Sequence, residues 1–216
     1  MALSPQLKER ILIATQHEPA PVRRQVVSQT LAIVCGAVAV PLVAFFSVGG
    51  ARPGERPLSL VLATAVGAFA VAAVTLYLAL GRGPRMLGRA RGWLVLAGIA
   101  APLAFLAWKA GLSAEFAQAD PWPTRPGYRC LILTFSFALA PLSALFFIRR
   151  GSDPTHPRSL GLALAVGAGT AASTLVDLWC PVGHLRHLVL GHVLPVLALG
   201  GLGVWLGQRL LSIRSK

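Results

Sequence analysis

Residues 58–80 read LSLVLATAVGAFAVAAVTLYLAL, an apolar run that contains no charged side chain. A helix needs ~20 such residues to cross the hydrocarbon core of a bilayer. Because a backbone inside lipid must pair its polar groups within the segment, the run is predicted to be a helix. Five further apolar runs accompany it, at Thr30–Val48, Trp93–Leu112, Cys130–Ile148, Ser159–Leu178 and Leu188–Leu206. The sequence therefore predicts an all-α membrane protein, a bundle of six transmembrane helices.

The composition favours the same fold class. Of the 216 residues, 55% are hydrophobic and only 12% are charged, and the mean hydropathy is +0.68. Such a chain has more apolar surface than a soluble domain of this size could bury. The net charge of +13 arises from 20 Lys and Arg residues, which cluster in the short connections between the apolar runs, where anionic headgroups favour them. We therefore expect contact with membrane lipid and no direct contact with nucleic acid.

The basic residues also predict an orientation. When they are assigned to alternate sides of the membrane, one side carries fourteen and the other carries six. The richer side holds the N-terminal segment, the second and fourth connections and the C-terminal tail. Because cytoplasmic connections carry the excess of Lys and Arg, both termini are predicted to lie in the cytoplasm, with the spans in the inner membrane. The first apolar run is too long for a secretory signal and is expected to remain as a helix.

Three regions follow from this pattern: a cytoplasmic helix and linker at 1–29, the transmembrane domain at 30–208 and a cytoplasmic tail at 209–216. In the first region Ser4 can cap a short amphipathic helix, which is predicted to stop at Pro19. Its apolar stripe consists of Leu7, Ile11 and Ala14. A helix this short cannot bury its apolar stripe by itself. It must therefore lie on the membrane, fold back on the bundle or dock onto a partner.

Two cysteines are predicted at the periplasmic face. Cys130 opens the fourth span and Cys180 follows the fifth, whereas Cys35 lies inside the first span and is assigned to packing. Thiols that face an oxidising compartment can pair or act as sensors. A disulfide would also require α-carbons within about 7 Å, and two buried cysteines can simply act as small hydrophobic residues. We favour the paired or reactive role.

Three histidines crowd the same predicted edge: His184, His187 and His192. Cysteine and histidine bind soft or borderline metals, and Cys180 and His184 would lie one turn apart in a helix. Pro181 and Gly183 argue against a helix there, and no recognised zinc spacing is present. The histidines are therefore candidates either for a metal or proton site or for interfacial residues at the start of the last span.

The sequence gives little support to an enzyme. It contains no G-x-S-x-G motif, no glycine loop that could hold phosphate ahead of a strand, and no pair of intramembrane carboxylates. We expect no catalytic activity and no cofactor. The alternative function is a small transporter or a metal-responsive membrane protein built around Cys180, His184, His187 and His192, with the N-terminal helix as an anchor only.

The whole pattern resembles the NrsF family of small bacterial membrane anti-sigma factors. The resemblance rests on the N-terminal Leu3-Ser4-Pro5-Gln6-Leu7-Lys8-Glu9-Arg10-Ile11, on Glu18-Pro19-Ala20-Pro21-Val22-Arg23, on the six spans, and on Asp177-Leu178-Trp179-Cys180-Pro181 with a downstream Leu190-Gly191-His192. It covers nearly the whole chain. It implies a negative regulator that holds an extracytoplasmic-function sigma factor at the inner membrane until a stress signal arrives, and it leaves self-association open.

The resemblance also implies roles for particular residues. Leu7 and Ile11 would be apolar anchors on the sigma factor, and four basic residues would engage its acidic surface: Lys8, Arg10, Arg23 and Arg24. Cys130 and Cys180 match the two periplasmic cysteines of the family and would sense a redox or metal signal.

Overall fold

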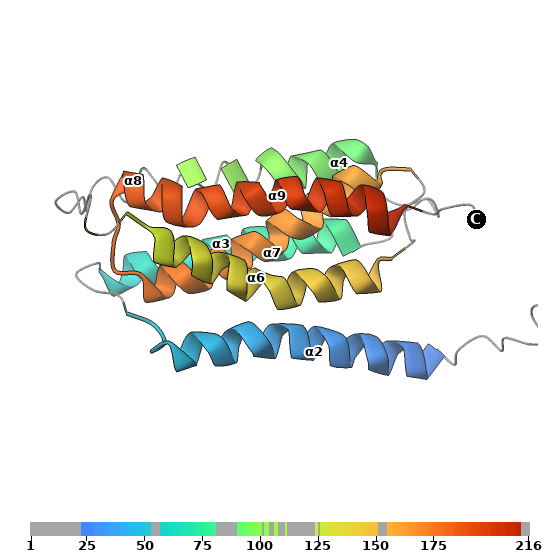
Figure 1. Ribbon diagram of the computed structural model, residues 1–216, viewed down its shortest axis with the longest axis horizontal. Helices are drawn as coiled ribbons and strands as arrows, with labels where there is room; N and C mark the ends of the chain where they lie inside the picture. Colours follow the sequence, from blue (N-terminus) through green and yellow to red (C-terminus); the bar gives the residue numbers. More distant parts are fainter. Residues whose placement is uncertain are drawn as a thin grey trace, which may run out of the picture.

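The computed structural model describes residues 23–52, 57–80, 90–100, 102–103, 106–107, 111, 124, 126–150 and 155–212. All regular structure within these ranges is helical, and the long helices lie side by side in a bundle (Figure 1). The elements are α2 (Arg23–Ser47), α3 (Leu58–Leu80), α4 (Arg91–Val95), η1 (Leu96–Ala100), α6 (Tyr128–Ile148), α7 (Pro157–Trp179), α8 (Leu185–Leu188), η2 (Val189–Val193), α9 (Leu194–Leu206) and η3 (Gly207–Leu211). The three η elements are π-helical turns.

Five helical stretches in the described ranges are long and apolar enough to cross a membrane. They are Ser28–Ser47, Leu58–Leu80, Tyr128–Ile148, Pro157–Trp179 and Leu185–Leu211. These match five of the six predicted runs within a few residues, apart from the last, which continues to Leu211. The remaining run is described without a break only over its first part, as the apolar helix Arg91–Ala100. A sixth full span therefore stays a prediction.

The first helix begins earlier than predicted. α2 starts at Arg23, so residues 23–29, predicted to precede the first span, already belong to this helix. Charged residues are good helix formers, and a helix can extend beyond the apolar run that crosses the lipid. The predicted amphipathic helix, with Leu7, Lys8, Arg10 and Ile11, lies outside the described residues.

α7 forms the centre of the bundle. It contacts α2, α3, α6 and α9 as well as α4 with η1, and 78% of its most apolar stretch is buried. Its sequence, PRSLGLALAVGAGTAASTLVDLW, is rich in Gly, Ala, Ser and Thr. Small side chains let neighbouring helices approach closely, which is how helices associate where lipid removes the hydrophobic driving force. α2, by contrast, lies at the edge of the bundle, with only 11% of its stretch buried.

α7 approaches α9 and η3 closely enough for their backbones to touch. A β-carbon placed on Gly203 would collide with the Gly161 carbonyl and the Ala165 side chain, and one on Gly207 would collide with the Pro157 carbonyl. Gly203 and Gly207 therefore form a packing face against α7. In the first turn of α7, Arg158 Nε donates a 2.6 Å hydrogen bond to Gln208 Oε1 of η3.

The two ends of the bundle carry different features. The start of α2 and the end of η3 lie at one end in Figure 1, together with the start of α7. The start of α6, the end of α7 and α8 lie at the opposite end. The beginning and end of the described chain therefore share one end of the bundle, as the predicted topology requires.

Gly203→Leu should separate α7 from α9 and destabilise the bundle by roughly 1–3 kcal/mol or more, since overpacking a close contact has costs of this size. Gly201→Leu in the same helix is the matched control, because nothing lies within 4 Å of a β-carbon there. Thermal unfolding of the detergent-solubilised variants measures the difference. Equal midpoints for the two variants would contradict this packing.

Candidate functional site

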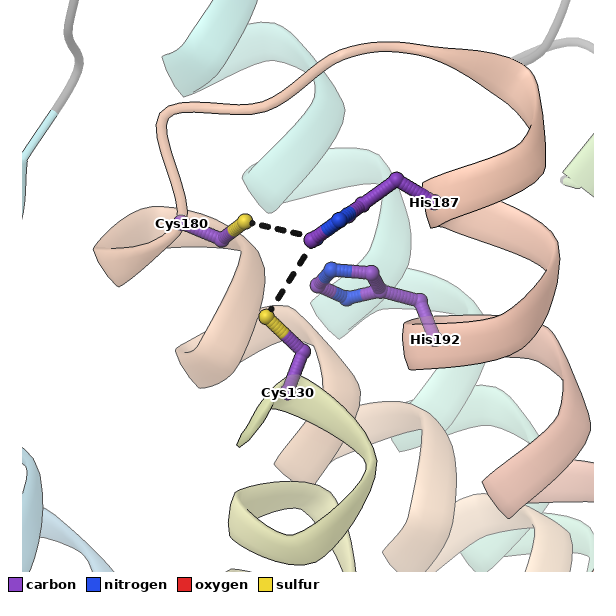
Figure 2. A group of neighbouring side chains, drawn as sticks. All are labelled: Cys130, Cys180, His187 and His192. Carbon is purple, nitrogen blue, oxygen red and sulfur yellow. Dashed lines mark hydrogen bonds between the residues drawn. The ribbon is translucent and has the colours of Figure 1, made fainter. Parts of the chain in front are cut away.

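Four buried side chains from different elements meet at the end of the bundle where α6 begins. Cys130 lies in the first turn of α6, Cys180 directly follows α7, His187 belongs to α8 and His192 to η2. Figure 2 shows both sulfur atoms and both imidazole rings directed toward one another. One nitrogen or sulfur atom from each residue lies within 4.8 Å of the other three. We call these four residues the Cys–His cluster.

Local backbone features position the members of the cluster. α7 ends at Trp179, and residues 180–184 are not helical, as predicted from Pro181 and Gly183. Gly127 precedes α6 with a φ of 103°, a backbone conformation that residues other than glycine rarely adopt. Gly191 lies against Cys130, since a β-carbon on Gly191 would be 3.0 Å from the Cys130 β-carbon. These glycines let the start of α6 approach η2 closely.

The π turn η2 explains how the two histidines share the cluster. Residues five apart in an α-helix are rotated by about 140° from each other, because each residue turns the helix by about 100°. A π turn is wider and bonds residue i to residue i+5, which brings residues five apart toward the same face. His187 and His192 are five apart, and their ring centroids lie 5.9 Å from each other.

The contacts inside the cluster centre on His187. Its Nε2 lies 3.1 Å from Cys180 Sγ and 3.4 Å from Cys130 Sγ, and neither thiol belongs to a disulfide. The neighbouring Cys130 thiol lowers the pKa of Cys180, with further lowering from His187 and His192, against the opposing effect of burial. Of the two thiols, Cys180 is therefore the one that loses its proton more readily, and the thiolate is the form that binds metals.

Two cavities adjoin the cluster on different sides. The larger has a volume of about 760 Å³ and is lined by Cys130, Cys180 and His187 together with Arg52 and Arg129. The smaller has a volume of about 30 Å³ and is lined by His192, Asp177 and several Thr and Ser side chains. Asp177 lies near the end of α7, yet its side chain is buried.

The rim of the cluster is tied to α2. Trp179 Nε1 donates a 3.0 Å hydrogen bond to the Val48 carbonyl. The Arg52 amide donates a 2.7 Å hydrogen bond to the Leu178 carbonyl, and the Arg52 guanidinium lies 5.7 Å from the Trp179 ring centroid. The residue immediately before Cys180 is thus joined to the end of α2.

The sequence predicts all four members of the Cys–His cluster as site residues, but it also predicts one histidine that is not a member. Cys130, Cys180, His187 and His192 come together, whereas His184 lies outside the group. Cys35, assigned to packing, is exposed on α2. Of the residues proposed to bind a sigma factor, only Arg23 and Arg24 fall in a described element. The convergence of Cys130 with the histidines depends on Gly127 and Gly191, and the two cysteines and three histidines were the only signal for it in the sequence.

Comparison with known proteins identifies the family. The family model described as "Negative regulator of sigma F", NrsF, matches residues 14–212. A stretch of 62 residues is 42% identical to the Anti-sigma-F factor NrsF of Caulobacter vibrioides, and it covers 29% of each chain. No solved structure matches the chain. Because the family model spans nearly the whole chain, the protein belongs to the NrsF family of negative regulators of sigma F.

Proposed function

We propose that the protein is a membrane-bound anti-sigma factor that holds an extracytoplasmic-function sigma factor at the bacterial inner membrane. Residues 1–29 would bind the sigma factor in the cytoplasm, and a redox or metal signal at Cys130 and Cys180 in the periplasm would release it. The observation that carries the proposal is the family match over residues 14–212. A matched relative bears the name of an anti-sigma-F factor.

The sigma-binding element of this proposal is the N-terminal segment. An isolated helix of about four turns is marginal in water, and it gains stability when its apolar face docks into a groove on a partner. Leu7 and Ile11 supply that face. Lys8, Arg10, Arg23 and Arg24 would contact acidic surface on the sigma factor. Because α2 begins at Arg23, the segment is followed directly by a helix that crosses the bundle.

The hydrogen bonds at the rim support a route between the two ends. A change in the cluster would move Cys180 and the adjoining Trp179, whose indole is bonded to the end of α2. α2 spans the bundle from this end to the opposite one, where the helix begins at Arg23 (Figure 1). For the signal to reduce sigma affinity tenfold, the two states of the cluster must differ in sigma binding by ~1.4 kcal/mol.

The second candidate function, a metal-responsive protein or small transporter, has support from one observation. The Cys–His cluster provides metal-binding side chains, which favours a metal response over transport. The cavity beside His192 and Asp177 has a volume of about 30 Å³, which is room for about one water molecule, and the larger cavity is lined by residues at one end of the bundle.

Deletion of residues 2–22 should abolish recovery of the sigma factor with the tagged chain, because it removes the apolar anchors and leaves α2 intact. The sigma factor that co-purifies from the native host is identified by mass spectrometry. Deletion of residues 213–216, at the same predicted side of the membrane, is the matched control and should have no effect. If the chain without residues 2–22 still inserts and still retains the sigma factor, this segment is not the binding element.

Replacing Cys130 and Cys180 together with serine should leave sigma binding intact and abolish induction of sigma-dependent promoters, since the signal input is lost. A promoter fusion measures the response. Cys35→Ser is the control and should respond as the unmodified chain does, because Cys35 lies exposed on α2. A double variant with normal induction would contradict the sensing role.

Trp179→Phe should weaken induction several-fold while the chain still binds the sigma factor, because an aromatic ring is kept while the donor to the Val48 carbonyl is lost with the pyrrole part of the indole. Trp205→Phe is the matched control. Trp205 is exposed on α9 and contacts Arg209 through its ring face. If both variants respond to the same extent, this hydrogen bond does not carry the signal.

A further inference from the structure

We propose that Cys130, Cys180, His187 and His192 form a complete four-ligand site for one divalent metal ion of the Zn²⁺ type. The inference deepens the proposed function, because it names a ligand and two further residues for the signal site. It is tested on the purified protein without a sigma factor, so either one can fail while the other stands.

The spacing of the ligand atoms fits a tetrahedral ion. With Zn–S bonds of about 2.3 Å and Zn–N bonds of about 2.0 Å, the ligand atoms of a tetrahedral site lie about 3.3–3.8 Å apart. Both sulfur atoms lie 3.1–3.4 Å from His187 Nε2. All four ligand atoms lie within 4.8 Å of one another, so a shift of about 1 Å in the widest pair completes the tetrahedron.

His192 gives an independent reason to expect a ligand. The residue is only 2% exposed, and neither ring nitrogen has a hydrogen-bond partner among the described residues. A buried polar atom without a partner costs on the order of 1–3 kcal/mol. The ring is nevertheless directed toward the two thiols and His187 (Figure 2). A bond from one of its nitrogens to a metal ion would satisfy an atom that the protein leaves unsatisfied.

The charge of the site selects a divalent ion. Two thiolates and two neutral imidazoles carry a total charge of −2, which a divalent ion neutralises. A monovalent ion such as Cu⁺ would leave a net charge of −1 in a buried place, next to the cavity that holds the Asp177 carboxyl group. Uncompensated charge in a poorly solvated interior is strongly unfavourable. Tetrahedral sites with two sulfur and two nitrogen ligands are typical of Zn²⁺.

The larger cavity provides a route for exchange. It reaches Cys130, Cys180 and His187 and contains about 760 Å³, which is ample for a hydrated ion to approach. On binding, two sulfur–metal and two nitrogen–metal bonds form, and the two thiols release two protons to water in the cavity. No oxidant or reductant is required.

The test uses the full chain in lipid nanodiscs with Zn²⁺ or Co²⁺ as the only added ligand. The unmodified protein should bind one Zn²⁺ per chain. Bound Co²⁺ should give the intense visible bands of a tetrahedral site and sulfur-to-cobalt charge transfer. Replacing either cysteine with serine should remove about half of that charge-transfer intensity, because each thiolate contributes separately.

His192→Ala should weaken Zn²⁺ binding by more than about tenfold, since even residues that only support a ligand change metal affinity by 10–100-fold. His184→Ala is the matched histidine control and Cys35→Ser the cysteine control, and both should bind as the unmodified chain does. Thermal unfolding checks that each variant is folded. If a folded His192→Ala variant binds Zn²⁺ normally, or the unmodified chain retains only Cu⁺, the proposed site is wrong.

Discussion

The packing of α7 against the other described spans fixes where both ends of the molecule lie. Its small residues allow α9 and η3 to approach within backbone contact distance at Gly203 and Gly207, respectively. Its C-terminal end carries Cys180, and the preceding Trp179 bonds to the end of α2. The Cys–His cluster therefore adjoins the end of this central helix, and α2, which packs mainly on α6, is tied to the same place through Trp179. A change at the cluster therefore acts directly on the ends of packed helices.

A bilayer restricts what can connect two such ends. Only helices can cross hydrocarbon with their backbone groups satisfied, so a signal between compartments must move through helix packing. The beginning and end of the described chain share one end of the bundle, and the cluster occupies the other (Figure 1). The excess of Lys and Arg predicts that the first end is cytoplasmic, which would place a sigma-binding segment and a periplasmic sensor on opposite sides of the membrane.

Much of the fold could be predicted because apolar length decides it. Five predicted spans agree with helices of the structure, and the break at Pro181 follows from proline chemistry. The start of α2 at Arg23 could not be predicted from hydropathy, since a helix can continue beyond the lipid. Family membership could be predicted because the leading segment and the Cys180-Pro181 end occur together in one chain.

The composition of the cluster was harder to predict. His184 lies one helical turn from Cys180 in sequence only, because the chain is not helical between them. His187 and His192 would lie on different faces of an α-helix, and the π turn η2 brings them together. Such a turn has no clear signal in a single sequence. Cys130 reaches the histidines across 57 residues, through a close approach between Gly127 and Gly191 that depends on tertiary packing.

The proposed function requires that the Cys–His cluster and the sigma-binding segment be energetically coupled across the bundle. The most direct measurement is the dissociation constant of the complex between the sigma factor and the full chain in nanodiscs, before and after Zn²⁺ is added. Loading the cluster with Zn²⁺ is expected to weaken sigma binding by about tenfold or more. Equal dissociation constants in the two states, with Zn²⁺ bound, would contradict it.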